Sequence, residues 1–135
     1  MSALLVVAAW LEAVTGLVLL IAPSLLVSIL LGAPLDTSSG AVLARVAGAA
    51  LLSLALICWL ARNDQQHQAK RLIKALLLYN ATVVAVLIHA YAALGLSGIG
   101  LWPAVVVHIV LAGWCVRACL PWGSSRRVDG NFGGH

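Results

Sequence analysis

Four apolar runs, each about as long as a membrane-spanning helix, constrain the fold of this chain more than any other feature. They cover about residues 3–22, 41–61, 69–94 and 102–120, and a helix needs about 20 apolar residues to cross a bilayer. Of the 135 residues, 63% are hydrophobic and 9% are charged, too little polar surface for a water-soluble domain. The sequence therefore predicts an all-α fold, an integral membrane four-helix bundle with short connections.

The first run is interrupted by a proline at position 23. A straight helix from Ala3 to Leu31 would be about 43 Å long, whereas the hydrocarbon layer is about 30 Å thick. Because proline cannot continue a helical hydrogen-bond ladder, we expect a break at Pro23 and an interfacial segment after the first span. Residues 1–122 then form one membrane domain, and the Gly/Ser-rich residues 123–135 form a flexible cytoplasmic tail.

The basic segment ARNDQQHQAKRLIK, residues 61–74, predicts the orientation in the membrane. It holds four of the chain's eight Lys and Arg residues, whereas the first outer loop, residues 32–40, holds none. Short basic loops stay in the cytoplasm during insertion, so both termini are expected there, in a bacterial inner membrane. Since the cations lie at membrane ends, the expected partners are lipid and other membrane subunits or a homo-oligomer, with no nucleic acid.

Polar side chains inside the predicted spans are the candidate site residues, because such groups are costly in a bilayer. The five candidates for ligand binding are Glu12, Arg45, Asn80, His89 and His108. From the helical rise, Glu12 lies about 15 Å below the outer end, at a depth close to that of Tyr79 and Asn80. Glu12 and Arg45 are expected to share one buried network, either as a structural ion pair or as a proton-accepting carboxylate and an anion-binding arginine.

Arg45, His89 and His108 lie at similar depths, about 6, 8 and 10 Å from the outer end. We expect them to line an internal pocket that opens toward the glycine-rich turn GLSGIG, residues 95–100. The cofactor is unknown. Two histidines at this depth fit ordinary polar packing or a small-ligand site, and alternatively a haem iron held from both sides or a quinone. Two histidines alone are weak evidence for haem, so ordinary polar packing or a small-ligand site is the favoured interpretation.

The cysteines and the other two histidines have plainer interpretations. Cys58, Cys115 and Cys119 fall near the inner face, where we interpret them as small hydrophobic residues and predict no metal site. His67 and His135 lie in the basic loop and the tail, where we expect solvated surface. The sequence contains no phosphate-binding loop, zinc-protease motif or nucleophile elbow, so it offers no catalytic motif, which argues against an enzyme without deciding the question.

Three segments carry a resemblance to a known group of proteins: WLEAVTGLVLLIAP, VLARVAGAALLSLALICWLAR and LYNATVVAVLIHAYAALGLSGIGLWPAVVVH. In overall pattern, in the glutamate of the first span and in the arginine that opens the second, the chain resembles small four-span bacterial membrane proteins of the DoxX-like kind. The resemblance implies a four-helix bundle, with some relatives acting as membrane subunits beside quinone-linked or sulfur-linked oxidoreductases.

Two functions are compatible with these observations. The small size, the small extramembrane mass and the small-residue helix faces favour an accessory or assembly subunit of a bacterial inner-membrane complex. The alternative is a ligand-handling protein, either a quinone or haem electron carrier or a small proton-coupled transporter, that uses the candidate residues above.

Overall fold

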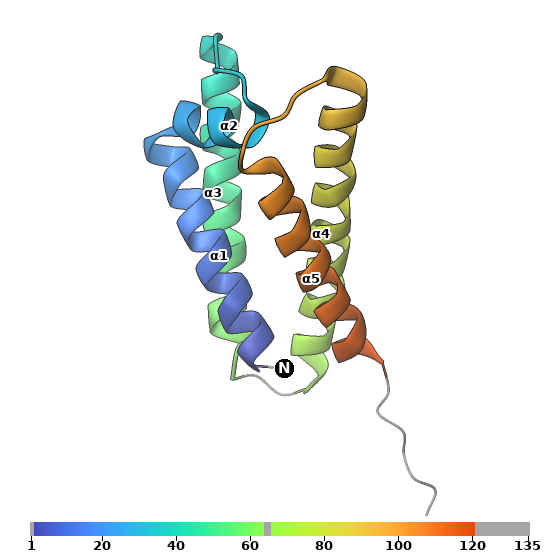
Figure 1. The fold of residues 1–135 in the computed structure, drawn as a ribbon. Helices are drawn as coiled ribbons and strands as arrows, with labels where there is room; N and C mark the ends of the chain where they lie inside the picture. Colours follow the sequence, from blue (N-terminus) through green and yellow to red (C-terminus); the bar gives the residue numbers. More distant parts are fainter. Residues whose placement is uncertain (1, 64–65, 121–135) are drawn as a thin grey trace, which may run out of the picture.

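The structure, a computed structural model, describes residues 2–63 and 66–120. Within these ranges the chain is mostly helical, and its long helices run along the bundle (Figure 1). The five helices are α1 (Ser2–Ile21), α2 (Pro23–Leu31), α3 (Ser38–Ala61), α4 (Gln66–Leu94) and α5 (Leu101–Cys119). Four of them, all but α2, are long and apolar enough to cross a membrane. The predicted all-α membrane bundle is therefore confirmed.

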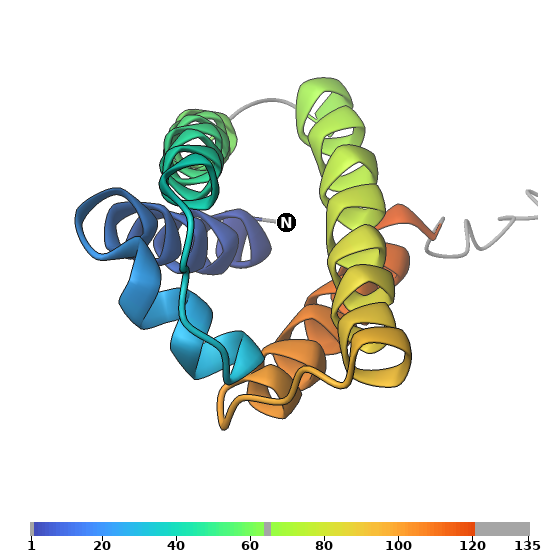
Figure 2. The same cartoon turned by 90° about the horizontal axis from the view of Figure 1, so that it is seen from above.

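The bundle is built from two closely packed helix pairs, α1 with α3 and α4 with α5. Seen from above, α3 and α4 stand apart although they follow each other in the chain (Figure 2). The α1–α3 pair packs backbone to backbone at Gly16 and Gly48. A Cβ atom placed on either glycine would lie 2.7 Å from the carbonyl oxygen of the other, so this crossing depends on the absence of side chains.

Helix α2 lies across one end of the bundle, which we call the α2 end (Figure 2). Pro23 occupies the first turn of α2, and the preceding Ala22 has a non-helical backbone (φ −135°, ψ 62°), so the predicted break is confirmed. Gly32 ends α2 with φ 70° and donates its N–H to the Ser28 carbonyl, a left-handed helix cap that glycine adopts readily. The chain then enters α3, where the Thr37 hydroxyl accepts the Gly40 N–H at 3.1 Å.

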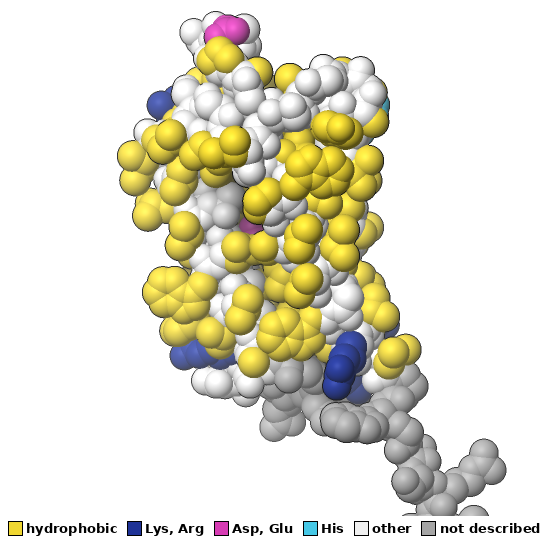
Figure 3. Space-filling model, in the orientation of Figure 1, with side chains coloured by type: hydrophobic (Ala, Val, Ile, Leu, Met, Phe, Trp, Pro, Cys, Tyr) yellow, Lys and Arg dark blue, Asp and Glu magenta, His cyan; other side chains and the backbone are white. Residues whose placement is uncertain are grey.

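The opposite end of the bundle, where α1 begins and α5 ends, carries most of the cations (Figure 1). We call it the basic end, because five exposed or half-buried cations lie there, the last of them in the final turn of α5: Arg62, Lys70, Arg71, Lys74 and Arg117. In Figure 3 hydrophobic side chains cover the sides of the molecule, and the visible Lys and Arg side chains lie mainly near this end. This surface suits a bilayer, so the protein is a small integral membrane protein.

The buried core consists of two apolar clusters. The larger one lies toward the basic end and joins all four long helices, through residues such as Leu4, Cys58, Ile73 and Leu111. The smaller one, Leu87, Leu101 and Val105, joins α4 and α5 toward the α2 end. The two buried polar residues among those described, Glu12 and Asn80, belong to the segments of α1 and α4 that connect these clusters.

Candidate functional site

Glu12 on α1 is the most unusual side chain of the bundle. It is 2% exposed, and its Oε2 accepts a hydrogen bond of 3.0 Å from the hydroxyl of Tyr79 on α4. Its other oxygen, Oε1, is buried and has no hydrogen-bond partner in the described part of the chain. A buried polar atom without a partner costs about 1–3 kcal/mol. Glu12 therefore links the two helix pairs and keeps one acceptor available to a further group.

Asn80, the neighbour of Tyr79, is 1% exposed and links α4 to α5. Its Nδ2 donates to the Leu76 carbonyl at 2.7 Å, and its Oδ1 lies 2.7 Å from Nδ1 of His108. The Leu76 carbonyl can only accept, which fixes the orientation of the amide. Oδ1 therefore faces His108, and Nδ1 of His108 must carry the hydrogen of this bond.

These residues form one polar layer within the membrane domain: Glu12, Tyr79, Asn80 and His108. The rings of Tyr79 and His108 meet edge to face, with centroids 5.9 Å apart and planes at 77°, a favourable arrangement for aromatic rings. The layer thus connects α1, α4 and α5. The depth estimate that placed Glu12 level with Tyr79 and Asn80 is confirmed, although no sequence pattern singled out the tyrosine as the direct partner.

The predicted pairing of Glu12 with Arg45 is wrong. Arg45 is exposed, and its Nε donates to the carbonyl of Leu20 at 3.3 Å. Leu20 lies in the last turn of α1, where carbonyl groups lack partners within the helix and a cation is favourable. The long stem of Arg45 carries its charge toward the α2 end of the bundle, where the guanidinium caps the last turn of α1.

The predicted pocket shared by Arg45, His89 and His108 is also wrong. His89 is exposed, whereas His108 is half-buried and bonded to Asn80. His89 follows Asn80 by nine residues, which in an α-helix is a rotation of about 180° and a rise of about 14 Å. His89 therefore lies on the opposite side of α4 from the residue that holds His108. The two histidines do not face each other, so a haem iron held between them is excluded.

The glycine-rich turn does not open toward a ligand pocket, contrary to our expectation. It is tied to α2, because Gly98 donates its N–H to the Leu30 carbonyl at 3.1 Å and Gly100 donates to the Ile29 carbonyl at 2.9 Å. A Cβ atom on Gly98 would collide with the Ile29 carbonyl. The glycines thus allow two backbones to touch, and they fasten α2 over the α4–α5 pair.

The cysteines behave as packing residues. All three are free, and Cys58 and Cys115 are buried in the larger apolar cluster, against which Cys119 also packs. Within residues 2–63 and 66–120, no group of three His, Cys, Asp or Glu side chains is placed to hold a metal ion. The predicted flexible tail at 123–135, with His135, lies outside the described residues, as does the side chain of His67.

Comparison with protein-family models, curated proteins and solved structures gives no match to this chain. The similarity to DoxX-like proteins therefore stays an expectation from the sequence. What the geometry offers is a layer of four side chains joined by two hydrogen bonds, Tyr79 to Glu12 and His108 to Asn80. One carboxylate oxygen, Glu12 Oε1, has no partner among the described residues. The binding of a ligand by any of the five candidate residues stays a prediction.

Proposed function

We propose that the protein is an accessory or assembly subunit of a bacterial inner-membrane complex, and that α3 provides its docking face. One observation carries this proposal. On the side of α3 that faces away from α1, the small residues Ala50 and Ser53 are exposed between the larger Val46 and Ile57, and the exposed Ala47 and Ala49 flank them. At 100° per residue, Ala50 and Ser53 lie nearly opposite Gly48, which contacts α1.

Small exposed residues have a particular meaning in a membrane. Lipid tails are as apolar as leucine, so transmembrane helices associate through close packing, and small residues allow this close approach. The Ser53 hydroxyl already donates to the Ala49 carbonyl at 3.0 Å and therefore adds no polar cost to such a contact. The DoxX-like resemblance supports a partner among quinone-linked or sulfur-linked oxidoreductases.

A bulky side chain on this face tests the proposal. We expect native mass spectrometry of gently solubilised membranes to show the wild-type chain in a larger assembly, and Ala50→Phe to release it as a free chain. The matched control is Val106→Phe, which enlarges an exposed residue of α5 and should leave the assembly intact. A wild-type chain that is free of other subunits, or an Ala50→Phe variant that stays assembled, contradicts the proposal.

A second candidate function, ligand handling at the polar layer, is supported by the unpartnered Oε1 of Glu12. This oxygen accepts hydrogen bonds, so it suits a proton or a ligand with a donor group. Glu12→Gln keeps the shape of the side chain and removes the acid. Proton uptake into vesicles under an imposed gradient, measured with an internal pH-sensitive dye, should fall in this variant. Equal uptake by both proteins excludes this candidate.

The orientation belongs to the same proposal, with the basic end on the cytoplasmic side. The cations at this end outnumber those at the α2 end, where Arg45 is the exposed cation among the described residues, as the positive-inside rule requires. In a variant whose native cysteines are alanine, an introduced cysteine at Ser38 or Ser97 should react with a membrane-impermeant maleimide from outside intact cells. A cysteine at Gln66 should react only after lysis. The reverse pattern shows that the orientation is wrong.

A further inference from the structure

An open groove of about 360 Å³ runs along the lipid-facing side of the α1–α3 pair. Its floor consists of small buried residues, Ala9 and Ala55, and exposed Trp10, Leu56 and Trp59 stand at its sides. From Leu52 to Trp59 the groove follows α3 for about 10 Å. The groove is therefore narrow and apolar, and it runs parallel to the bundle, which is the direction of an acyl chain in the same leaflet.

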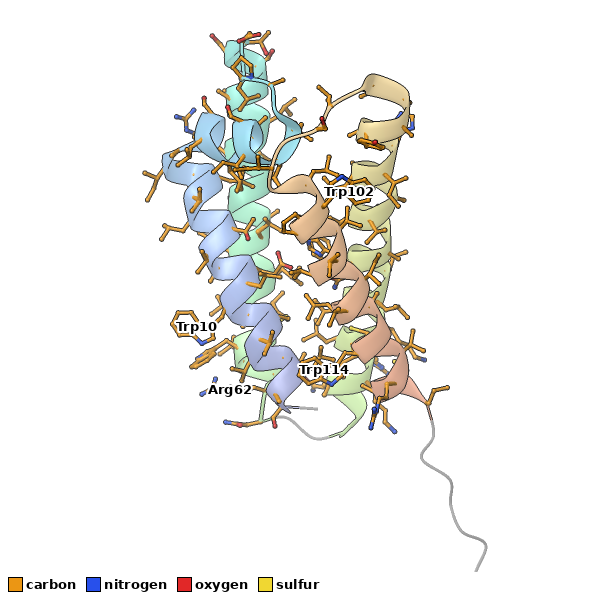
Figure 4. The ribbon with its side chains drawn as sticks, in the orientation of Figure 1. Trp10, Arg62, Trp102 and Trp114 are labelled. Carbon is orange, nitrogen blue, oxygen red and sulfur yellow. The ribbon has the colours of Figure 1, made fainter. Side chains whose placement is uncertain are left out.

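Arg62 stands where the groove meets the basic end. Its guanidinium lies 4.0 Å from the centre of the Trp59 ring, and its Nη1 donates to the Trp59 carbonyl at 2.5 Å. Figure 4 shows Trp10 and Arg62 on the same side of the bundle. A guanidinium has five N–H groups in a planar fork, so the bond to Trp59 holds Arg62 in place and leaves others for an oxyanion.

We propose that this groove binds an anionic phospholipid of the leaflet at the basic end, with its phosphate on Arg62 and an acyl chain between Trp10 and Trp59. An acyl chain alone gives no selectivity, because it exchanges one apolar environment for another. Arg62 supplies the selectivity, since arginine binds phosphate oxygens through paired N–H groups and its charge favours a headgroup that has no ammonium group to offset the phosphate. Tryptophan suits this depth, with its ring in the apolar region and its N–H near the headgroups.

Native mass spectrometry with defined lipids tests the site. The protein is purified in a mild detergent and mixed with phosphatidylglycerol or with phosphatidylcholine of the same acyl chains. Both lipids offer a phosphate, but the choline ammonium neutralises the headgroup of phosphatidylcholine and repels Arg62. We therefore expect one phosphatidylglycerol to be retained about tenfold more strongly than phosphatidylcholine. Arg62→Gln should abolish this preference, while Arg117→Gln, a change of the same charge at the same end on α5, should preserve it.

Two further measurements separate the alternatives. Leu56→Trp places a large ring beside the groove from an exposed position, so it should weaken retention of the phosphatidylglycerol without unfolding the bundle. If that variant aggregates, the same measurement is made on Ala13→Phe, which fills the groove from α1. An excess of inorganic phosphate should not displace the lipid, and displacement would show a site for free phosphate only. Equal retention of both lipids, an unaffected Arg62→Gln variant, or a groove that binds a second copy of the chain overturns the proposal.

Discussion

Gly48→Leu is expected to separate α1 from α3 and to lower the free energy of unfolding by about 3 kcal/mol, at the upper end of the range for overpacking. A Cβ atom at Gly48 would lie 2.7 Å from the Gly16 carbonyl oxygen and 2.9 Å from Cβ of Leu19. Both neighbours belong to the α1 helix, so a larger side chain can only be accommodated if the helices move apart. Unfolding in mixed detergent micelles, followed by circular dichroism and tryptophan fluorescence, measures the loss.

The matched control for this prediction is Gly113→Ala on α5. Gly113 also lies inside a long helix, but a Cβ atom there would meet nothing within 4 Å. Because alanine favours the helix by about 1 kcal/mol over glycine, this variant should be as stable as the wild type or more stable. Gly48→Ala should lie between the two, since a single methyl group requires a smaller shift. If Gly48→Leu unfolds at the same detergent composition as Gly113→Ala, the close α1–α3 crossing is wrong.

The fold was largely predictable because the membrane imposes length. Each of the four apolar runs became one helix, and the Pro23 break followed from the excess length of the first run. The rotation of each helix about its axis was not predictable in the same way. In a soluble bundle the polar side of a helix marks its outer face, whereas in a bilayer both faces are apolar, and exposed residues such as Leu43 and Leu78 resemble buried ones.

In the candidate site, too, the sequence predicts the depth of a residue in the membrane better than the direction in which its side chain points. The helical rise placed Glu12 level with Tyr79 and Asn80, and these residues do share the polar layer. It also placed His89 level with His108, but His108 bonds Asn80, which lies about 14 Å along α4 from His89 and on the opposite side of that helix. Near a helix end the cost of exposing a histidine is small, because headgroups and water are within reach. The helical rise therefore gave the correct level for Glu12, Tyr79 and Asn80, but it gave the wrong level for His108 and did not give the direction of His89.

Arg45 illustrates a second reason for the wrong prediction. An arginine inside an apolar run suggests a buried partner of opposite charge, and Glu12 on the neighbouring helix was the available one. The structure satisfies Arg45 with a backbone carbonyl, that of Leu20, which is open because α1 ends there. A sequence pattern shows side chains and not the unpaired carbonyl groups of helix ends, so this partner was not recognisable. Glu12→Leu and Arg45→Leu should consequently have additive effects.

Tyr79→Phe is expected to lower the free energy of unfolding by about 1–2 kcal/mol, the largest effect that we expect from the loss of one oxygen atom in this bundle. The hydroxyl of Tyr79 is the donor to the buried carboxylate oxygen Oε2 of Glu12. The other carboxylate oxygen of Glu12, Oε1, already lacks a partner, so the variant leaves the whole carboxyl group without a hydrogen bond from the described residues. The ring itself stays in place against His108, which confines the change to the hydroxyl.

A double-mutant cycle with Glu12→Leu shows whether this loss comes from Glu12. Leucine at position 12 removes the unpartnered oxygen but also takes away the acceptor of the Tyr79 hydroxyl, so we expect the single variant to lose stability. The double variant, in which both partners are apolar, should be more stable than Glu12→Leu alone. With leucine there, Tyr79→Phe should cost little, and the coupling energy should approach the full 1–2 kcal/mol. Tyr91→Phe is the control, because Tyr91 lies on the same helix, is 46% exposed and packs its ring on Trp102. A coupling energy near zero would mean that the hydroxyl of Tyr79 stabilises the bundle through another contact, and Glu12 would then be isolated from α4.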